Sequence, residues 1–140
     1  KNLKFIPVNE IEDIFVSSKA YLDNLRIRES NEDIFSTANI LLLDEENITR
    51  MYIEEYFKDN QIKPQHILEV SSMDLLIEFA KTGLGVACVI KEFVSEELRD
   101  GRLIQIPLKK PINKREVGFC YNTAAYLSDS MKKLIEFIKN

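Results

Sequence analysis

The sequence contains few of the residues that most often carry chemistry. Its 140 residues include one histidine, two cysteines and no tryptophan. Because a lone imidazole without a companion cysteine, histidine or acid cluster is a weak metal ligand or catalytic base, we interpret His66 as an exposed loop residue. Cys88 and Cys120 lie in apolar surroundings and form no Cys-x-x-Cys pair, which predicts two buried thiols in a reducing cytoplasm. These residues predict no metal site, no catalytic set and no cofactor.

The sequence also lacks a long apolar run and an excess of positive charge. Its longest apolar run, "GVACVI", is the length of a strand, far below the roughly 20 residues of a membrane span, so we expect no membrane contact. It carries 19 basic and 23 acidic residues, and its densest basic segment, "LKKPINKRE", resembles a solvated hairpin. Because duplex binding depends on Lys and Arg, we expect no nucleic-acid surface on this chain. Since it starts at Lys1 and not at Met, we expect a piece of a longer protein.

Glycine is scarce too, but two of the four glycines stand together in "TGLGV". A Gly-x-Gly pair next to an apolar run can form a phosphate-binding loop. That loop requires the order strand, glycine loop, helix, so that the N–H groups at the start of the helix face the phosphates. Here the order is helix, Gly83-Leu84-Gly85, strand, and neither a third glycine nor Gly-Lys-Ser/Thr is present. The pair therefore predicts the end of a helix and the start of a buried strand.

Short apolar runs alternate with segments of helical periodicity along most of the chain. We expect strands over residues 3–18, 38–43, 66–70, 86–90, 102–108 and 116–122. We expect helices over residues 19–25, 45–60, 71–83, 91–101 and 128–140. Strands that alternate with helices predict an α/β domain with a largely parallel sheet and right-handed crossovers.

Two of the expected helices carry signals that locate their ends and faces. In the helix over 71–83, Ser71 followed by Asp74 resembles a capping box, and Gly83 stands where a left-handed residue ends a helix. In the helix over 45–60, the apolar face consists of residues at helical spacing: Ile48, Met51, Tyr52, Tyr56 and Phe57.

The segment "EVSSMDLLIEFAKTGLGVACVIKEFVSEELRDGRLIQIPL" resembles the second subdomain of the effector-binding domain of LysR-type transcriptional regulators. "ANILLLDEENITRMYIEEYFKDNQIKP" is similar to the preceding unit of that subdomain, and "IEDIFVSSKAYL" to the strand that crosses into it. "REVGFCYNTAAYLSDSMKKLIEFIKN" is similar to the returning strand and C-terminal helix of the first subdomain. The quoted segments include no counterpart of the family's winged helix-turn-helix or of the opening elements of the first subdomain.

The resemblance implies a Rossmann-like, three-layer fold of the type II periplasmic-binding-protein kind. It implies one complete subdomain over residues 18–106. Residues 1–17 and 107–140 would be the crossover strands and the C-terminal part of the first subdomain. In that architecture the end of the first crossover strand borders the ligand cleft, which implies effector contacts from Ser17 and Ser18.

The resemblance also implies a function. A small-metabolite effector, a carboxylate or another anion, would bind between the subdomains and change the arrangement of attached DNA-binding domains. Effector domains of the family pair as homodimers or higher oligomers, and DNA would be contacted only through the N-terminal domain.

The pattern of strands and helices by itself points to two loops near any ligand. In open α/β sheets, ligands bind beyond the carboxyl ends of the strands, and the loops 44–49 and 71–73 lie there and open helices whose N-termini favour anions. We expect effector contacts from Ser71 and Ser72, although either could serve only as a cap. Met73 is a further candidate, with core packing as the alternative.

Asn47 and Thr49 are the candidates in the first loop, and Asp44 is the candidate for its cap. The three acids Asp44, Glu45 and Glu46 would oppose an anionic effector. They could instead complement the dipole of the helix that follows them.

Two other classes of function remain open from the sequence. An enzyme on a related two-lobed α/β scaffold would need a nucleophile or an acid–base set, and no Gly-x-Ser-x-Gly elbow, Cys–His pair or metal-ligand spacing is present. An extracytoplasmic solute-binding protein would need a secretion signal ahead of the domain.

Overall fold

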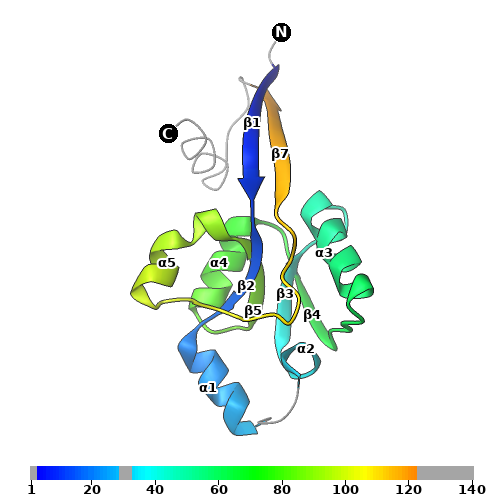
Figure 1. The fold of residues 1–140 in the computed structure, drawn as a ribbon. Helices are drawn as coiled ribbons and strands as arrows, with labels where there is room; N and C mark the ends of the chain where they lie inside the picture. The colour runs from blue at the N-terminus through cyan, green and yellow to red at the C-terminus, as the bar shows by residue number, and fades with distance from the viewer. Residues whose placement is uncertain (1–2, 29–32, 123–140) are drawn as a thin grey trace.

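A computed structural model of the protein describes residues 3–28 and 33–122 (Figure 1). In chain order the elements are β1 (Leu3–Ile11), β2 (Asp13–Ser17), α1 (Lys19–Arg28), α2 (Ile34–Thr37), β3 (Asn39–Leu43), α3 (Ile48–Asp59), β4 (His66–Val70), α4 (Met73–Lys81), β5 (Val86–Ile90), the 3-10 helix η1 (Lys91–Phe93), α5 (Ser95–Asp100), β6 (Ile104–Gln105) and β7 (Arg115–Asn122). The predicted order of strands and helices is confirmed over these residues with two differences: the strand expected over 3–18 forms β1 and β2, and the short helix α2 was not predicted. The helix expected over 128–140 lies outside the described residues.

The main sheet has five strands in the order β4-β3-β5-β2-β6. β3, β4 and β5 are parallel, whereas β2 runs antiparallel to β5 and to β6. The expected largely parallel sheet is therefore present, with β2 as the reversed strand. β2 is reversed because it enters the sheet directly from β1, at the end where the parallel strands finish (Figure 1).

Helices cover both faces of this sheet, because alternate strand residues point into two separate cores. One core packs α4 against Leu41, Ala87 and Val89. The other core packs α1, α2 and α3 against Ile40, Leu42 and their neighbours. In the second core the rings of Phe15, Phe35 and Phe57 meet, with centroid distances of 5.1, 5.6 and 5.8 Å. The three-layer α/β prediction is thus confirmed.

The helix ends follow the sequence signals, with a shift of one residue at α4. Its N-cap is Ser72 and not Ser71: the Ser72 hydroxyl accepts a hydrogen bond from Leu75 N–H at 3.2 Å. At its other end Gly83 has φ +84°, and the Gly83 and Leu84 N–H groups donate to the carbonyls of Ala80 and Phe79. This is a Schellman motif, which satisfies the last carbonyls of the helix. The "TGLGV" segment therefore ends a helix, as the order of elements predicts.

The buried face of α3 agrees only in part with the predicted one. Phe57 is buried and Tyr52 and Tyr56 pack against the core as predicted. Ile48 and Met51 are instead 77% and 61% exposed, and Ile53 and Arg50 are buried in their place. Helical spacing finds residues that share a face, but two apolar stripes overlap in this helix and only one of them meets the sheet. The cap of α3 also differs from the candidate Asp44, because Asn47 accepts from Thr49 N–H at 2.8 Å.

The end of the main sheet brings two further corrections. The strand expected over 102–108 shortens to the two residues of β6, because Pro107 has no N–H with which to continue the pairing. The predicted hairpin over "LKKPINKRE" is wrong. β6 pairs with β2 and β7 pairs with β1, so the segment between them runs from one sheet to the other. It lies against α3, where Tyr52 and Tyr56 donate to the carbonyls of Asn113 and Lys110.

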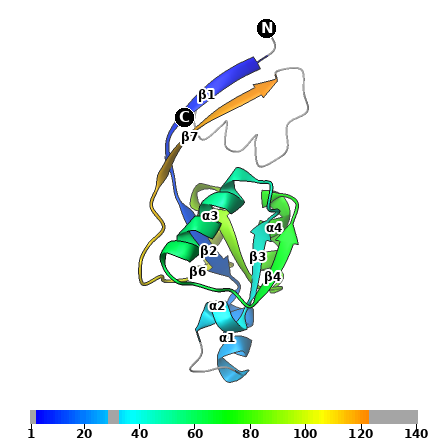
Figure 2. The ribbon, with the colours of Figure 1, turned by 90° about the vertical axis from the view of Figure 1, so that its right-hand side faces the viewer.

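β1 and β7 form a separate antiparallel pair that extends away from the main sheet (Figure 2). Their pairing runs from Leu3 opposite Asn122 to Ile11 opposite Arg115, with an irregularity between Val8 and Ile11. Because β2 is hydrogen-bonded within the main sheet, the division expected between residues 17 and 18 separates this strand from its sheet. We propose instead that the main unit begins near Glu12.

Candidate functional site

The candidate site lies at one edge of the main sheet, where the three parallel strands end. Leu43 and Val70 are paired at the carboxyl ends of β3 and β4, so the loops that follow these two strands are neighbours. Asp13, the first residue of the reversed strand β2, pairs with Ile90 at the end of β5 and lies at the same edge. This edge therefore gathers the start of α3, the start of α4 and the junction between β1 and β2.

The polar side chains that open the two helices share one feature: each already accepts a hydrogen bond. Asn47 Oδ1 accepts from Thr49 N–H at 2.8 Å, and Ser72 Oγ accepts from Leu75 N–H at 3.2 Å. Thr49 Oγ1 accepts from Arg115 Nη2 at 3.0 Å. Within residues 3–28 and 33–122, the donors of these groups have no partner: the Asn47 amide N–H groups and the two hydroxyl protons.

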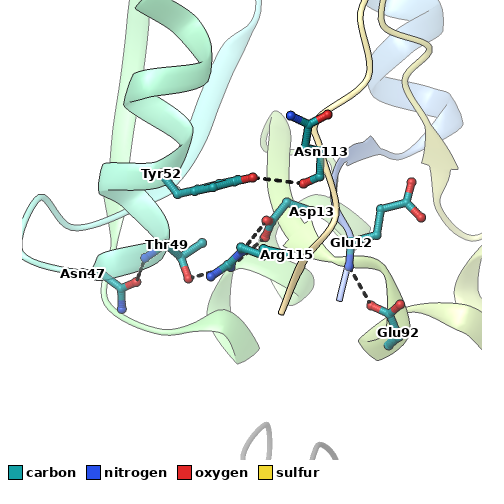
Figure 3. A network of polar contacts seen from close by, with 8 residues as sticks. All are labelled: Glu12, Asp13, Asn47, Thr49, Tyr52, Glu92, Asn113 and Arg115. Carbon is teal, nitrogen blue, oxygen red and sulfur yellow. Dashed lines mark hydrogen bonds and ion pairs between the residues drawn. The ribbon is translucent and has the colours of Figure 1, made fainter. Parts of the chain in front are cut away.

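Arg115 is held at this edge by a buried ion pair, shown in Figure 3. Its Nε and Nη2 donate to Asp13 Oδ2 and Oδ1 at 2.7 and 3.0 Å, and the side chains are only 12% and 0% exposed. The guanidinium carbon lies 5.2 Å from the ring centroid of Tyr52. Burial works against the charge, but the hydrogen bonds and attraction of Asp13 more than offset it, so the pKa of Arg115 is above its ordinary value. The guanidinium is a permanent cation here, neutralised by Asp13.

No sequence pattern indicates this ion pair. Asp13 and Arg115 are 102 positions apart, and in the sequence Arg115 is one of several basic residues in the segment "LKKPINKRE". An ion pair between distant segments leaves no local periodicity, and only the pairing of β1 with β7 places the two side chains together.

The other predicted residues at this edge have unequal surroundings. Ser71 is exposed, and Ser72 is partly buried through its capping bond. Met73 is 9% exposed and packs in the core beneath α4, which supports the core-packing alternative. We therefore retain Ser71, Ser72, Asn47 and Thr49 as the candidate ligand contacts.

The structure does not bring Ser17 and Ser18 to this edge. β2 is antiparallel to β5, so its last residue lies where the parallel strands begin. Ser17 is 0% exposed and donates to the Gly85 carbonyl at 2.7 Å. Ser18 is 8% exposed, and its hydroxyl accepts from Tyr21 N–H at the start of α1. Ser17 and Ser18 therefore lie apart from the loops that open α3 and α4, and the crossing segment meets those loops at Glu12 and Asp13. Effector contact from the two serines stays a prediction.

The charges around the edge are mostly acidic. Asp44, Glu45 and Glu46 are exposed. Arg50 is buried and donates to Leu43 O at 2.8 Å, and it pairs with the carboxylates of Glu54 and Glu69 at 2.7 and 3.1 Å. Both arginines at this edge are thus engaged by carboxylates.

A separate hollow lies between α3 and residues 110–113. Its volume is about 300 Å³, and it is bounded by Tyr52, Glu55, Tyr56, Asp59, Asn60 and residues 110–113. None of the predicted ligand residues bounds it. Within residues 3–28 and 33–122, no three His, Cys, Asp or Glu side chains are grouped as a metal ion would require. No helix in the same ranges combines the length and apolar character of a membrane span.

A family model described as the LysR substrate binding domain matches residues 2–140. The chain belongs to this family. It is 25% identical over 122 residues to the HTH-type transcriptional regulator CzcR of Bacillus subtilis (strain 168), a match that covers 84% of the chain but 42% of CzcR. The chain thus spans less than half of this curated relative.

Solved structures share the fold. The bromide-bound regulatory domain of HypT from Salmonella typhimurium matches with a TM-score of 0.66 and 16% identity, over 99% of this chain and 64% of that one. The regulatory domain of CcmR from Synechocystis PCC6803 in complex with 2-PG matches with a TM-score of 0.62 and 12% identity, over 98% and 65%. This LysR substrate-binding domain therefore has the periplasmic-binding-protein-like fold of LysR effector-binding domains, as the sequence resemblance implies.

Proposed function

We propose that this chain is the effector-sensing part of a LysR-type transcriptional regulator. The observation that carries the proposal is the row of free donors at the carboxyl edge of the sheet. The side-chain oxygens of Asn47, Thr49 and Ser72 each accept a hydrogen bond within the protein, and their N–H or O–H groups can donate to a ligand. These donors stand at the first turns of α3 and α4, where the helix dipoles add partial positive charge.

The donors favour an effector rich in acceptor oxygens, a carboxylate or another anion. HypT and CcmR, which share this fold, have structures with bromide and with 2-PG. The exposed acids Asp44, Glu45 and Glu46 oppose a high negative charge. A small acid with few charges fits both observations better than a polyanion does.

The rest of the function follows from this role. The described residues supply one wall of an effector cleft, and the rest of the first subdomain would supply the other wall. DNA would be contacted through an N-terminal domain, in a homodimer or higher oligomer that works in the cytoplasm, where the DNA is. We propose no enzymatic activity, because the side chains at the edge are engaged in capping and in an ion pair, and none of them forms a nucleophile–base pair. An enzyme or a solute-binding protein on the same scaffold is the alternative.

A thermal-shift screen on the full-length protein tests the proposal. One panel contains small carboxylates and phosphorylated acids, and a second contains amines of similar size. A ligand at 100 times its Kd stabilises the folded state by about 2.7 kcal/mol, which raises the Tm by several degrees. We expect stabilisation from members of the acid panel, and no stabilisation from either panel would contradict effector sensing.

Asn47→Asp then locates the site. Aspartate caps a helix as well as asparagine does, but the substitution replaces the free N–H donors with a second carboxylate oxygen. We expect the stabilising ligand from the acid panel to bind at least tenfold more weakly to this variant, with little change in the Tm of the ligand-free protein. Asn24→Asp, on the exposed side of α1, adds the same charge elsewhere and should leave the affinity unchanged. Equal effects of the two substitutions would show that the ligand binds away from α3.

A further inference from the structure

We propose that Arg115 is a positioning residue that couples Thr49, in the first turn of α3, to the pair of strands β1 and β7. The inference rests on the proposed function in one respect, since Thr49 is a proposed effector contact. It names the route by which events at that hydroxyl reach the strands that lead out of the main sheet.

One nitrogen atom carries the connection. Arg115 Nη2 donates both to Asp13 Oδ1 and to Thr49 Oγ1, each at 3.0 Å (Figure 3). Nη2 donates to one acceptor on β2 and to another on α3. A shift of the Thr49 hydroxyl therefore changes the geometry of the hydrogen bond to Asp13 as well.

The ion pair is too buried to absorb such a shift by itself. The side chains of Asp13 and Arg115 are 0% and 12% exposed, so breaking the bidentate contact would leave two buried charges unpaired. The two side chains therefore move together. Arg115 is also the residue opposite Ile11 where β1 and β7 first pair, and Asp13 follows Ile11 by two positions. A movement of the guanidinium therefore acts on the Ile11–Arg115 pair, which is the β1–β7 pair nearest to Asp13.

Tyr52 reinforces the connection from the next turn of α3. Its ring lies against the guanidinium at 5.2 Å, and its hydroxyl donates to the carbonyl of Asn113, two residues before Arg115, at 3.1 Å. On the other side Glu12 is bonded to η1, which follows β5: its carbonyl accepts from Lys91 N–H at 2.8 Å and its N–H donates to Glu92 at 3.3 Å. The end of β1 is thus anchored through η1, whereas the start of β7 is anchored through α3.

This arrangement gives the coupling a direction. A ligand oxygen that accepts the Thr49 hydroxyl proton polarises the hydroxyl and makes its oxygen a stronger acceptor for Arg115. Occupation of the site should then tighten the start of β7 against α3. Loss of the hydroxyl should loosen it.

Amide hydrogen exchange of the ligand-free protein tests the coupling with Thr49→Val and Thr49→Ser. Valine keeps the shape but removes the acceptor, so we expect at least threefold faster exchange in residues 3–11 and 115–122, with β3 and β5 unchanged. Serine restores the acceptor and should exchange like the wild type. Faster exchange confined to α3, or an equal acceleration in β3 and β5, would overturn the proposal, because the first shows no transmission and the second shows general destabilisation.

Tyr52→Phe and Tyr56→Phe supply a second test that keeps the Thr49 side chain. Each substitution removes one hydroxyl that donates to a carbonyl of the segment between β6 and β7. Only the Tyr52 bond lies next to Arg115, so we expect Tyr52→Phe alone to raise exchange in β1 and β7, and equal effects of both would overturn the route through Arg115. Neither test contains a ligand. A failed thermal-shift screen would therefore count against effector sensing and leave the coupling intact.

Discussion

Ser17 and Ser71 differ in their contribution to stability, because one is buried and hydrogen-bonded and the other is exposed. The Ser17 hydroxyl is fully buried and donates to the Gly85 carbonyl at 2.7 Å, whereas Ser71 is exposed and makes no hydrogen bond within the described residues. We expect Ser17→Ala to lower the free energy of unfolding by about 1–2 kcal/mol, because it removes a buried hydrogen bond. Ser71→Ala should change it by less than about 0.5 kcal/mol. Urea denaturation measures both, and equal values would contradict the assignment.

Cys88 gives the protein a specific dependence on alkaline pH. Burial, followed by the repulsion of Asp13, raises the pKa of its thiol well above the ordinary value of 9.0. The unfolded chain therefore loses this proton at a lower pH than the folded chain does, so the stabilising contribution is complete below pH 9 and is lost as the pH rises above it. The free energy of unfolding should fall by up to about 1.4 kcal/mol per pH unit more steeply than in Cys88→Ala. Parallel curves for the two proteins between pH 8 and pH 10 would refute this.

At the scale of the elements, the order of strands and helices could be predicted because its signals are local. Gly83 and the apolar run after it mark the end of α4 and the start of β5 by their chemistry alone. The direction of β2 could not be predicted, because it depends on where the chain enters the sheet. That direction moved Ser17 to the far edge and brought Asp13 to the site. The sequence located the helix starts that carry the candidate contacts, whose role stays a prediction, but it did not indicate the Asp13–Arg115 pair beside them.

The second glycine of "TGLGV" has a packing role that Gly83 does not share. A Cβ atom added at Gly85 would lie 2.4 Å from the backbone carbonyl oxygen of Asn39, whereas one added at Gly83 would lie 3.4 Å from the Ser18 hydroxyl. Gly83→Ala should cost about 1–2 kcal/mol, from its left-handed backbone. Gly85→Ala should cost more, about 3 kcal/mol or above, because β5 and β3 would have to move apart. Chemical denaturation of the two variants decides this, and a smaller loss for Gly85→Ala would show that the contact between the strands is loose.

The molecule as a whole combines a covered sheet with two regions that are open to further contact. One is the β1–β7 pair, which leaves the main sheet and continues toward the rest of the first subdomain in our proposal (Figure 2). The other is β4, the edge strand, whose first four residues are exposed. The loop ahead of α3 follows β3, which pairs with β4, and Thr49 in the first turn of α3 accepts a hydrogen bond from Arg115 at the start of β7.

Self-association through β4 is the prediction that belongs to this scale. An edge strand presents unpaired N–H and C=O groups, and Ile67 and Leu68 add apolar side chains that are 37% and 49% exposed. A lysine at this position opposes pairing with another strand, so we expect Leu68→Lys to lower the proportion of dimer or higher oligomer in sedimentation velocity. Leu84→Lys is the matched control, because Leu84 is 47% exposed but precedes β5 away from that edge. A clean monomer for the wild-type chain at high concentration, or an equal loss of oligomer in both variants, would exclude β4 as the contact.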